Sequence, residues 1–139
     1  MTFVLIELES VEALALLSTT SRGVSISGLD KGWDSTFVGA YFFTRTGTEQ
    51  DGTVALRTRM IEGTIEDPAT GSAASDLAAY LSLMQGAPGQ VFKYAITQGV
   101  EMGRRSDISV DVIMGQQSRI EKVVLGGGAV EVMQGQLSI

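Results

Sequence analysis

The sequence contains neither cysteine nor histidine among its 139 residues. Without cysteine it has no disulfide, no thiolate nucleophile and no cysteine-based metal site. Without histidine it lacks the commonest general acid/base, the commonest metal ligand and every Ser-His-Asp triad. Any site in this chain must therefore use carboxylates, hydroxyls, Arg, Lys, Tyr or backbone N–H groups.

Positive charge is also scarce, because 10 Lys+Arg stand against 16 Asp+Glu and give a net charge of −6. Nucleic acids and anionic membranes are bound through clustered basic residues, so the sequence argues against both partners. No apolar run approaches the roughly 18–20 residues that cross a bilayer, and the start of the chain has no signal-peptide pattern. These features predict a soluble, cytoplasmic protein.

Proline is rare, with 2 residues against 17 glycines, while apolar residues make up 44% of the chain. This composition is typical of a tightly turned, β-rich globular protein, and its length fits a single domain over residues 1–139. No metal, flavin, nucleotide or pyridoxal signature is present, so we expect no cofactor. The run Gly126–Gly128 lies between predicted strands, which makes it a poor phosphate loop.

Short apolar or alternating segments predict that most of the chain is β-strand. The predicted strands cover residues 3–8, 23–29, 36–45, 53–61, 91–99, 107–114, 119–127 and 129–139. Residues 30–35 read as a turn. Gly47 and the pair Asp51-Gly52 predict a hairpin between the third and fourth of these strands.

Two helices are predicted among these strands. A short one follows Ser10 and ends near Leu17, and a long one runs from about Thr70 to Gln85, where a Gly-Ala-Pro sequence ends it. The long helix is rich in Ala and Leu, with Asp76 as its only charge, which is typical of an enclosed helix. The prediction is an α+β domain in which a curved antiparallel sheet or barrel wraps one buried helix. Periodicity alone leaves open an ordinary two-layer packing.

The segment EDPATGSAA, residues 66–74, carries the most chemistry. Pro68 disfavours a helical conformation at Asp67, so the chain turns there before the long helix. Either Asp67 or Thr70 has the side chain of a helix cap.

The residues that follow the turn, Gly71, Ser72 and Ala73, supply first-turn N–H groups without intrahelical partners. Their small side chains and the positive end of the helix dipole favour a carboxylate or a phosphate. The same run also satisfies the needs of a plain turn with an N-cap, and the residues alone leave both interpretations open.

Four stretches of the sequence resemble the PhzF-like (phenazine-biosynthesis-like) family. EDPATGSAA followed by an Ala/Leu helix is similar to that family's signature, and RTRMIEG before it to the approach strand. Residues 98–112, QGVEMGRRSDISVDV, resemble the family's Q-G-x-x-M-G-R-P-S segment, with Arg105 in place of the usual Pro. The closing VVLGGGAVEVMQGQL resembles its G-G-x-A-V-x-V-x-x-G-x-L pattern. The resemblance covers essentially the whole chain in order.

The resemblance implies a diaminopimelate-epimerase-like fold, with two similar domains, each a β-barrel-like sheet around a central helix. This chain corresponds to the C-terminal domain, and the active site lies in the cleft between the two. The implied activity is a cofactor-independent isomerisation or epimerisation, in which a proton moves on a small carboxylated metabolite, often in secondary metabolism.

The resemblance also implies which residues form the site. Asp67 and Ser72 match the family's active-site Asp and Ser. The implied substrate-binding residues are Thr70, Gly71, Ala73, Gln98, Gly99, Met102, Gly103 and Arg104. For Gly99 and Gly103 the alternative is a requirement of tight turns, and for Arg104 a surface ion pair.

In that family the Glu that transfers the proton, and a His that holds substrate, belong to the N-terminal domain. This chain has no His, and its early carboxylates do not lie in such a motif. Three interpretations follow: a C-terminal domain that works with a separate N-terminal domain, a homodimer that brings two Asp67/Ser72 helix ends face to face, or a non-catalytic binder of small molecules. The homodimer also allows a cyclisation driven by binding and polarisation alone.

Overall fold

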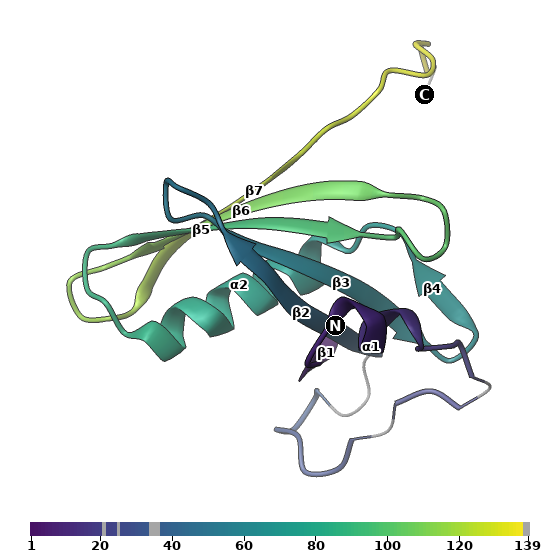
Figure 1. The fold of residues 1–139 in the computed structure, drawn as a ribbon, viewed down its shortest axis with the longest axis horizontal. Coiled ribbons are helices and arrows are strands. Elements are labelled where there is room, and N and C mark those ends of the chain that lie inside the picture. Colours follow the sequence, from purple (N-terminus) through teal and green to yellow (C-terminus); the bar gives the residue numbers. More distant parts are fainter. Residues whose placement is uncertain (21, 25, 34–36, 138–139) are drawn as a thin grey trace.

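The computed structural model describes residues 1–20, 22–24, 26–33 and 37–137 (Figure 1). In chain order its elements are β1 (Thr2–Glu7), α1 (Val11–Ala15), β2 (Val38–Thr48), β3 (Val54–Glu62), β4 (Ile65–Asp67), α2 (Gly71–Gln85), β5 (Val91–Gln98), β6 (Ser106–Met114) and β7 (Ile120–Gly127). The strands form one sheet in the order β1-β2-β3-β5-β6-β7, with β4 paired to β3.

The sheet is mixed, so the prediction of an antiparallel sheet is wrong in part. β1 pairs parallel with β2, and β3 pairs parallel with β5, whereas the other pairs are antiparallel. Parallel neighbours need a crossover connection, and here each crossover contains a helix, α1 in the first and α2 in the second. The sheet curls into a half-barrel with α2 packed against it, which confirms the α+β class (Figure 1).

The predicted hairpin is confirmed. β2 and β3 run antiparallel from Ala40↔Ile61 to Thr48↔Val54, with a bulge between Arg45 and Gly47. At the tip Gly52 has φ +87°, a conformation that glycine adopts without strain.

Two predicted strands are wrong. The described residues of 23–29 contain no strand, and neither do residues 128–137; residues 25, 34–36, 138 and 139 lie outside the described part of the chain. The C-terminal tail extends away from the body of the molecule (Figure 1), and Val130, Val132 and Met133 are each 87% exposed. An alternating segment forms a strand only where it can pair with a neighbouring strand and pack one face, and the described residues of these two segments pair with no strand.

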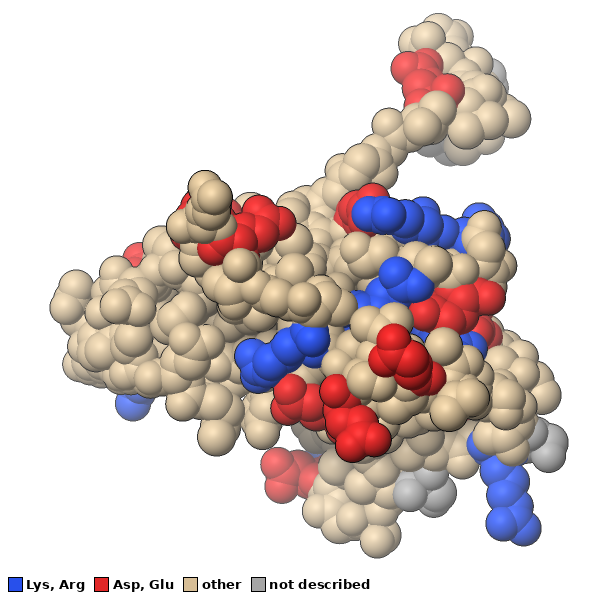
Figure 2. Space-filling view, viewed as in Figure 1, with Lys and Arg blue, Asp and Glu red and all other residues tan. Residues whose placement is uncertain are grey.

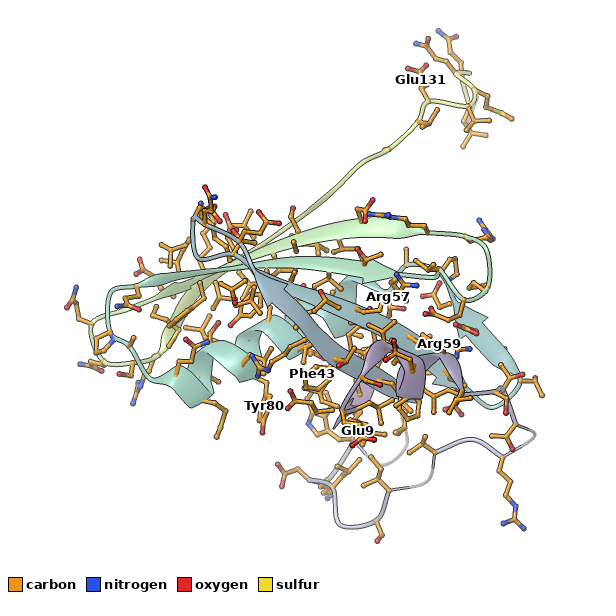
Figure 3. The ribbon with its side chains drawn as sticks, in the orientation of Figure 1. Glu9, Phe43, Arg57, Arg59, Tyr80 and Glu131 are labelled. Atoms are coloured by element: carbon orange, nitrogen blue, oxygen red, sulfur yellow. The ribbon has the colours of Figure 1, made fainter. Side chains whose placement is uncertain are left out.

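The core lies between the inner face of the sheet and one side of α2. The helix contributes Ala73, Ala74, Leu77, Ala78 and Leu81, and the sheet contributes residues such as Tyr41, Leu56, Tyr94, Ile96 and Val110. The opposite side of α2 is exposed and carries Ser72, Asp76, Tyr80, Leu83 and Met84. The prediction of an enclosed helix therefore holds for one side only, and Tyr80 projects from the other (Figure 3).

No described helix is long and apolar enough to span a membrane. On the face drawn in Figure 2, basic and acidic side chains of the described residues are interspersed, and no broad basic surface forms there.

Candidate functional site

The turn between β4 and α2 is closed by the Asp67 side chain. Asp67 ends β4, where it pairs with Met60 of β3. Its Oδ2 accepts a hydrogen bond from Thr70 Oγ1 at 2.7 Å, and its Oδ1 accepts one from the N–H of Ala69 at 3.4 Å. The carboxylate is therefore fixed at the rim of the helix start, as Asp side chains commonly are in turns.

The first turn of α2 has no side-chain cap. Thr70 occupies the N-cap position but makes no capping hydrogen bond, because its hydroxyl is donated to Asp67. No acidic residue lies in this turn either. The N–H groups of Gly71, Ser72 and Ala73 therefore keep their donor capacity for a ligand, next to the positive end of the helix dipole. The structure therefore does not contain the plain turn with a side-chain N-cap that the sequence left open.

Gln98 supports the turn from below and is fully buried. Its Nε2 donates to Asp67 O at 2.7 Å and to Thr70 Oγ1 at 2.9 Å. Its Oε1 accepts from Thr70 N at 3.3 Å and from the Tyr41 hydroxyl at 3.0 Å. Both amide donors and both acceptor positions are thus used within the protein, so Gln98 holds the turn in this structure.

Tyr41 extends this network toward the core. Its hydroxyl lies 3.0 Å from Thr58 Oγ1 as well as from Gln98 Oε1. Burial raises the pKa of Tyr41 above its ordinary value, so the phenol stays protonated. It has one proton to donate, and Gln98 Oε1 can only accept, so Thr58 is the natural donor to the Tyr41 oxygen.

The loop after β5 packs against the same turn. Gly99 has φ +77°, and a Cβ there would collide with the carbonyl oxygen of Arg104 and lie 2.8 Å from that of Pro68. The N–H of Arg104 donates to Gly99 O at 2.8 Å, and Gly103, with φ +75°, donates to Val100 O at 2.9 Å. Gly99 is therefore favoured by both close packing and its positive φ, and Gly103 by its positive φ alone.

The remaining predicted residues of this loop lie outside the helix start. Met102 is half-buried, and Arg104 is exposed with no ion pair among the described residues. The interpretation of Arg104 as a surface ion pair is therefore wrong for the described chain. None of the residues predicted between positions 98 and 104 lines either hollow at the helix start.

Two hollows meet at the start of α2. The smaller, ≈ 320 Å³, brings together Asp67, Ala69, Thr70, Gly71 and Ser72 with Met1, Phe3, Phe37 and Met60. The larger, ≈ 540 Å³, lies on the other side of Ala69 and Gly71 and is lined mainly by the start of β6 and the end of β7. The larger hollow contains neither Asp67 nor Ser72, so the chemistry points to the smaller one.

Arg105 belongs to the larger hollow. Its guanidinium pairs with Asp107 at 3.0 Å, and both side chains are about two-thirds exposed, at 65% and 66%. Because the charge is already paired and hydrated, Arg105 adds little to anion binding at the helix start.

The apolar wall of the smaller hollow was not predicted. Phe3 comes from β1, Phe37 from just before β2 and Met60 from β3, and the two rings meet edge-on at 6.2 Å. Parallel pairing of Phe3 with Gly39 brings them together, and a Cβ at Gly39 would lie 3.0–3.3 Å from all three side chains. Only the long-range pairing creates this wall, so no local sequence signal could have found it.

The site therefore combines free backbone donors, one carboxylate, one hydroxyl and an apolar wall. Such a combination suits a small amphipathic carboxylate, whose charged end binds the helix start while its carbon skeleton packs on the wall. Among the described residues, no group of three or more carboxylates could hold a metal ion.

Comparison with known proteins matches this chain to one family. The family model described as Phenazine biosynthesis-like protein matches residues 1–135. The Uncharacterized isomerase mll1393 of Mesorhizobium japonicum is 32% identical over 105 residues, which are 74% of this chain and 34% of that protein. The matched region thus spans about a third of the relative's length. The chain belongs to the phenazine biosynthesis-like family.

Proposed function

We propose that this chain forms one half of an isomerase-type active site that moves a proton on a small carboxylated metabolite. One observation carries the proposal: the hollow in which Asp67, Ser72 and the uncapped N–H groups of α2 face the apolar wall of Phe3, Phe37 and Met60. The family and the relative's name both support an enzyme of the isomerase type.

In the proposed reaction the helix start binds the substrate carboxylate. Removing a proton from the neighbouring carbon places negative charge on the carboxylate oxygens, and fixed N–H donors stabilise this charge in the transition state. Ser72 lies beside them and donates its hydroxyl, while Asp67 accepts a proton or hydrogen bond at the rim. Gly71 and Ala73 contribute backbone N–H groups, and Thr70 contributes by holding Asp67 in place through its hydroxyl.

The general base must be placed against the carbon on the side away from α2. We assign it to a second half, built either by a second copy of the chain or by an N-terminal domain in the diaminopimelate-epimerase-like arrangement. The exposed side of α2, with Tyr80, Leu83 and Met84, is the surface on which such a half would pack. A molar-mass measurement in solution distinguishes a dimer from a chain that needs another partner.

Binding is tested with benzoate, which carries a carboxylate on an apolar ring. We expect NMR titration to shift the amides of Gly71, Ser72 and Ala73 and the methyl of Met60. Benzylamine has the same ring with the opposite charge and should leave the helix-start amides unchanged. Equal shifts with both compounds, or none with benzoate at tens of millimolar, would rule the proposed site out.

Catalysis is tested by solvent-deuterium incorporation at the carbon next to the carboxylate in a panel of carbon acids. Incorporation that disappears in Asp67→Asn and Ser72→Ala supports the isomerase. The alternative is a binding domain or a binding-driven cyclase, which the absence of His and Cys favours. Benzoate binding without any exchange, in an assembly shown to contain both halves, would decide for that alternative.

A further inference from the structure

Two arginines project from the outer face of β3. Arg57 and Arg59 are two residues apart and so share one face of the strand, whereas Leu56, Thr58 and Met60 face the core with α2. Figure 3 labels both arginines. Each forms an ion pair with a carboxylate from a different segment around the site.

Arg59 holds the segment that ends in Asp67. Its Nε and Nη2 donate to the two oxygens of Glu66, both at 2.8 Å, and the side chains are only 6% and 10% exposed. Its Nη1 also donates to the carbonyl of Leu14 in α1 at 3.0 Å and to that of Leu17, just after α1, at 2.7 Å. The bidentate bond with Glu66 raises the pKa of Arg59 and fixes the residue next to Asp67.

Arg57 holds the loop that packs on Pro68. Its Nε and Nη2 donate to Oε1 of Glu101 at 3.3 and 2.9 Å, and the side chains are 19% and 12% exposed. The other carboxylate oxygen, Oε2, is buried and has no hydrogen-bond partner among the described residues. Among the described residues, Arg57 is therefore the side chain that hydrogen-bonds to Glu101. Glu101 lies two residues after Gly99, whose backbone packs closely against Pro68.

We propose that Arg57 and Arg59 are positioning residues that act on the carboxylate-binding helix start through Glu101 and Glu66. The inference rests on the proposed function of that helix start. Neither arginine lines the hollow, and each reaches the turn at residues 67–70 through one carboxylate. One strand thus anchors both segments that border the site.

The buried carboxylates explain why loss of an arginine would move the turn. A buried carboxylate without its partner is strongly unfavourable, so it moves toward water and draws its segment with it. For Glu66 that movement displaces Asp67, and for Glu101 it releases the loop behind Pro68. A displacement on the order of 1 Å at a binding or reacting group can cost roughly a hundredfold in function.

The test compares Arg59→Met and Arg57→Met with Arg45→Met. Arg45 lies on the neighbouring strand and pairs with Glu7, but that pair is about half exposed, at 47% and 52%. We expect the first two variants to bind benzoate roughly tenfold or more weakly, and Arg45→Met to bind it as the parent does. Arg59→Lys keeps the charge but not the two-pronged geometry, so its affinity should fall between parent and Arg59→Met.

A purely structural role is separated by Leu81→Ala, which removes core packing near the other end of α2. This variant should lose stability yet keep the parent's benzoate affinity. The proposal is overturned if Arg59→Met and Arg57→Met, folded, bind benzoate within twofold of the parent. It is equally overturned if Leu81→Ala weakens binding as much as they do.

A second readout needs no ligand, so it separates this inference from the proposed function. In the ligand-free protein, the amide shifts of Asp67 and of residues 69–71 should change in the two arginine variants and stay unchanged in Arg45→Met. If the parent binds no benzoate, the proposed function fails, and these amide shifts alone decide whether the arginines position the turn. Should an arginine variant not fold, Glu66→Gln and Glu101→Gln give the same readout; unchanged shifts there overturn the proposal.

Discussion

The two ends of α2 are built in opposite ways. At the C-terminal end Gly86 adopts φ +63°, its N–H donates to Ser82 O at 3.2 Å, and Ser118 Oγ donates to Gly86 O at 3.1 Å. At the N-terminal end no side chain caps the helix, and two hollows open beside Gly71. The C-terminal end is closed by Gly86 and Ser118, whereas the N-terminal end is open, because no side chain caps it.

This difference shows which contacts hold the open, N-terminal end of α2 in place. The C-terminal end needs a left-handed glycine and one serine, as helix ends commonly do. The N-terminal end is held indirectly, by Gln98 from β5 and by Gly99 against Pro68. Gln98 and Gly99 contact the turn before α2 and do not bond to the N–H groups of the first helical turn. This arrangement orders the turn and leaves the first turn of α2 without a side-chain cap.

The largest effect is expected from comparing Gly99→Ala with Gly86→Ala. At Gly99 the added Cβ meets the backbone of both Arg104 and Pro68 in addition to the positive φ, so we expect a loss of roughly 2–4 kcal/mol in unfolding free energy. At Gly86 the nearest atom is Leu83 O at 3.9 Å, and only the φ cost of about 1–2 kcal/mol remains. Urea unfolding of both variants measures the difference.

A second readout in the same variants concerns the site. Gly99→Ala should weaken benzoate binding, whereas Gly86→Ala should not, because its strain lies at the closed end. Equal losses of stability in the two variants would contradict the claim that the loop is wedged against Pro68.

The next effect compares Gln98→Leu with Tyr94→Phe. Leucine keeps the approximate size of Gln98 but leaves Asp67 O, Thr70 N and the Tyr41 hydroxyl without their partner, so we expect a loss of about 2–4 kcal/mol. Tyr94→Phe removes one hydroxyl contact, with Ser82, which still donates to Ala78 O, so about 1 kcal/mol is expected.

Benzoate titration sharpens this second comparison. Affinity should fall in Gln98→Leu and remain in Tyr94→Phe, since only the first network reaches the turn. A Gln98→Leu variant with unchanged stability and affinity would show that Gln98 does not hold the helix start.

A smaller effect is expected from Gly71→Ala at the open end itself. The new Cβ would lie 2.8 Å from Cδ2 of Leu125, the end of a half-exposed side chain that can move. Stability should therefore stay within about 1 kcal/mol of the parent, because alanine also favours the helix. Benzoate binding should weaken, since the methyl narrows access to the N–H groups. Leu125→Ala combined with Gly71→Ala should restore stability but not affinity.

The closed end of α2 was predictable from sequence because its causes are local. An Ala/Leu-rich segment followed by Gly-Ala-Pro predicts the helix and its end, and the helix ends at Gln85 as expected. The parallel pairings of β1 with β2 and of β3 with β5 were not predictable, because they depend on how two crossovers pass over the sheet. Alternation in residues 129–137 indicates a strand, but pairing decides whether one forms.

The open end was predictable only in part. Asp67, Thr70, Gly71 and Ser72 are adjacent in the chain, and the structure brings them together in one hollow. Gln98 could be placed near the turn by resemblance, but its burial depends on contacts 28 and 31 residues away.

The arginines of β3 were missed for a related reason. In RTRMIEG the alternating arginines look like the hydrated side of a strand. Their partners stand 7 and 44 residues away, so only the fold reveals two buried ion pairs.

The smallest effect concerns the one charge on α2, Asp76, compared with Asp107 at the start of β6. Asp76 lies on the exposed side of α2, but neighbouring atoms partly desolvate its carboxylate, which raises its pKa, opposed by the charge of the N-terminal amine. Its ionisation therefore lowers stability as pH rises through the folded-state pKa. Hydrogen bonding with Arg105 lowers the pKa of Asp107, so its contribution is present above the unfolded-state value and lost as pH falls through the folded one. Asp76→Asn should therefore be slightly more stable than the parent at pH 7 and equal to it at pH 3. Asp107→Asn should be slightly less stable than the parent at pH 7, and this difference should shrink as the pH is lowered to 3. Urea midpoints at pH 7 and pH 3 measure how the stability difference between each variant and the parent changes with pH. A change of the same sign for both variants would show that the helix dipole at the open end outweighs desolvation at Asp76.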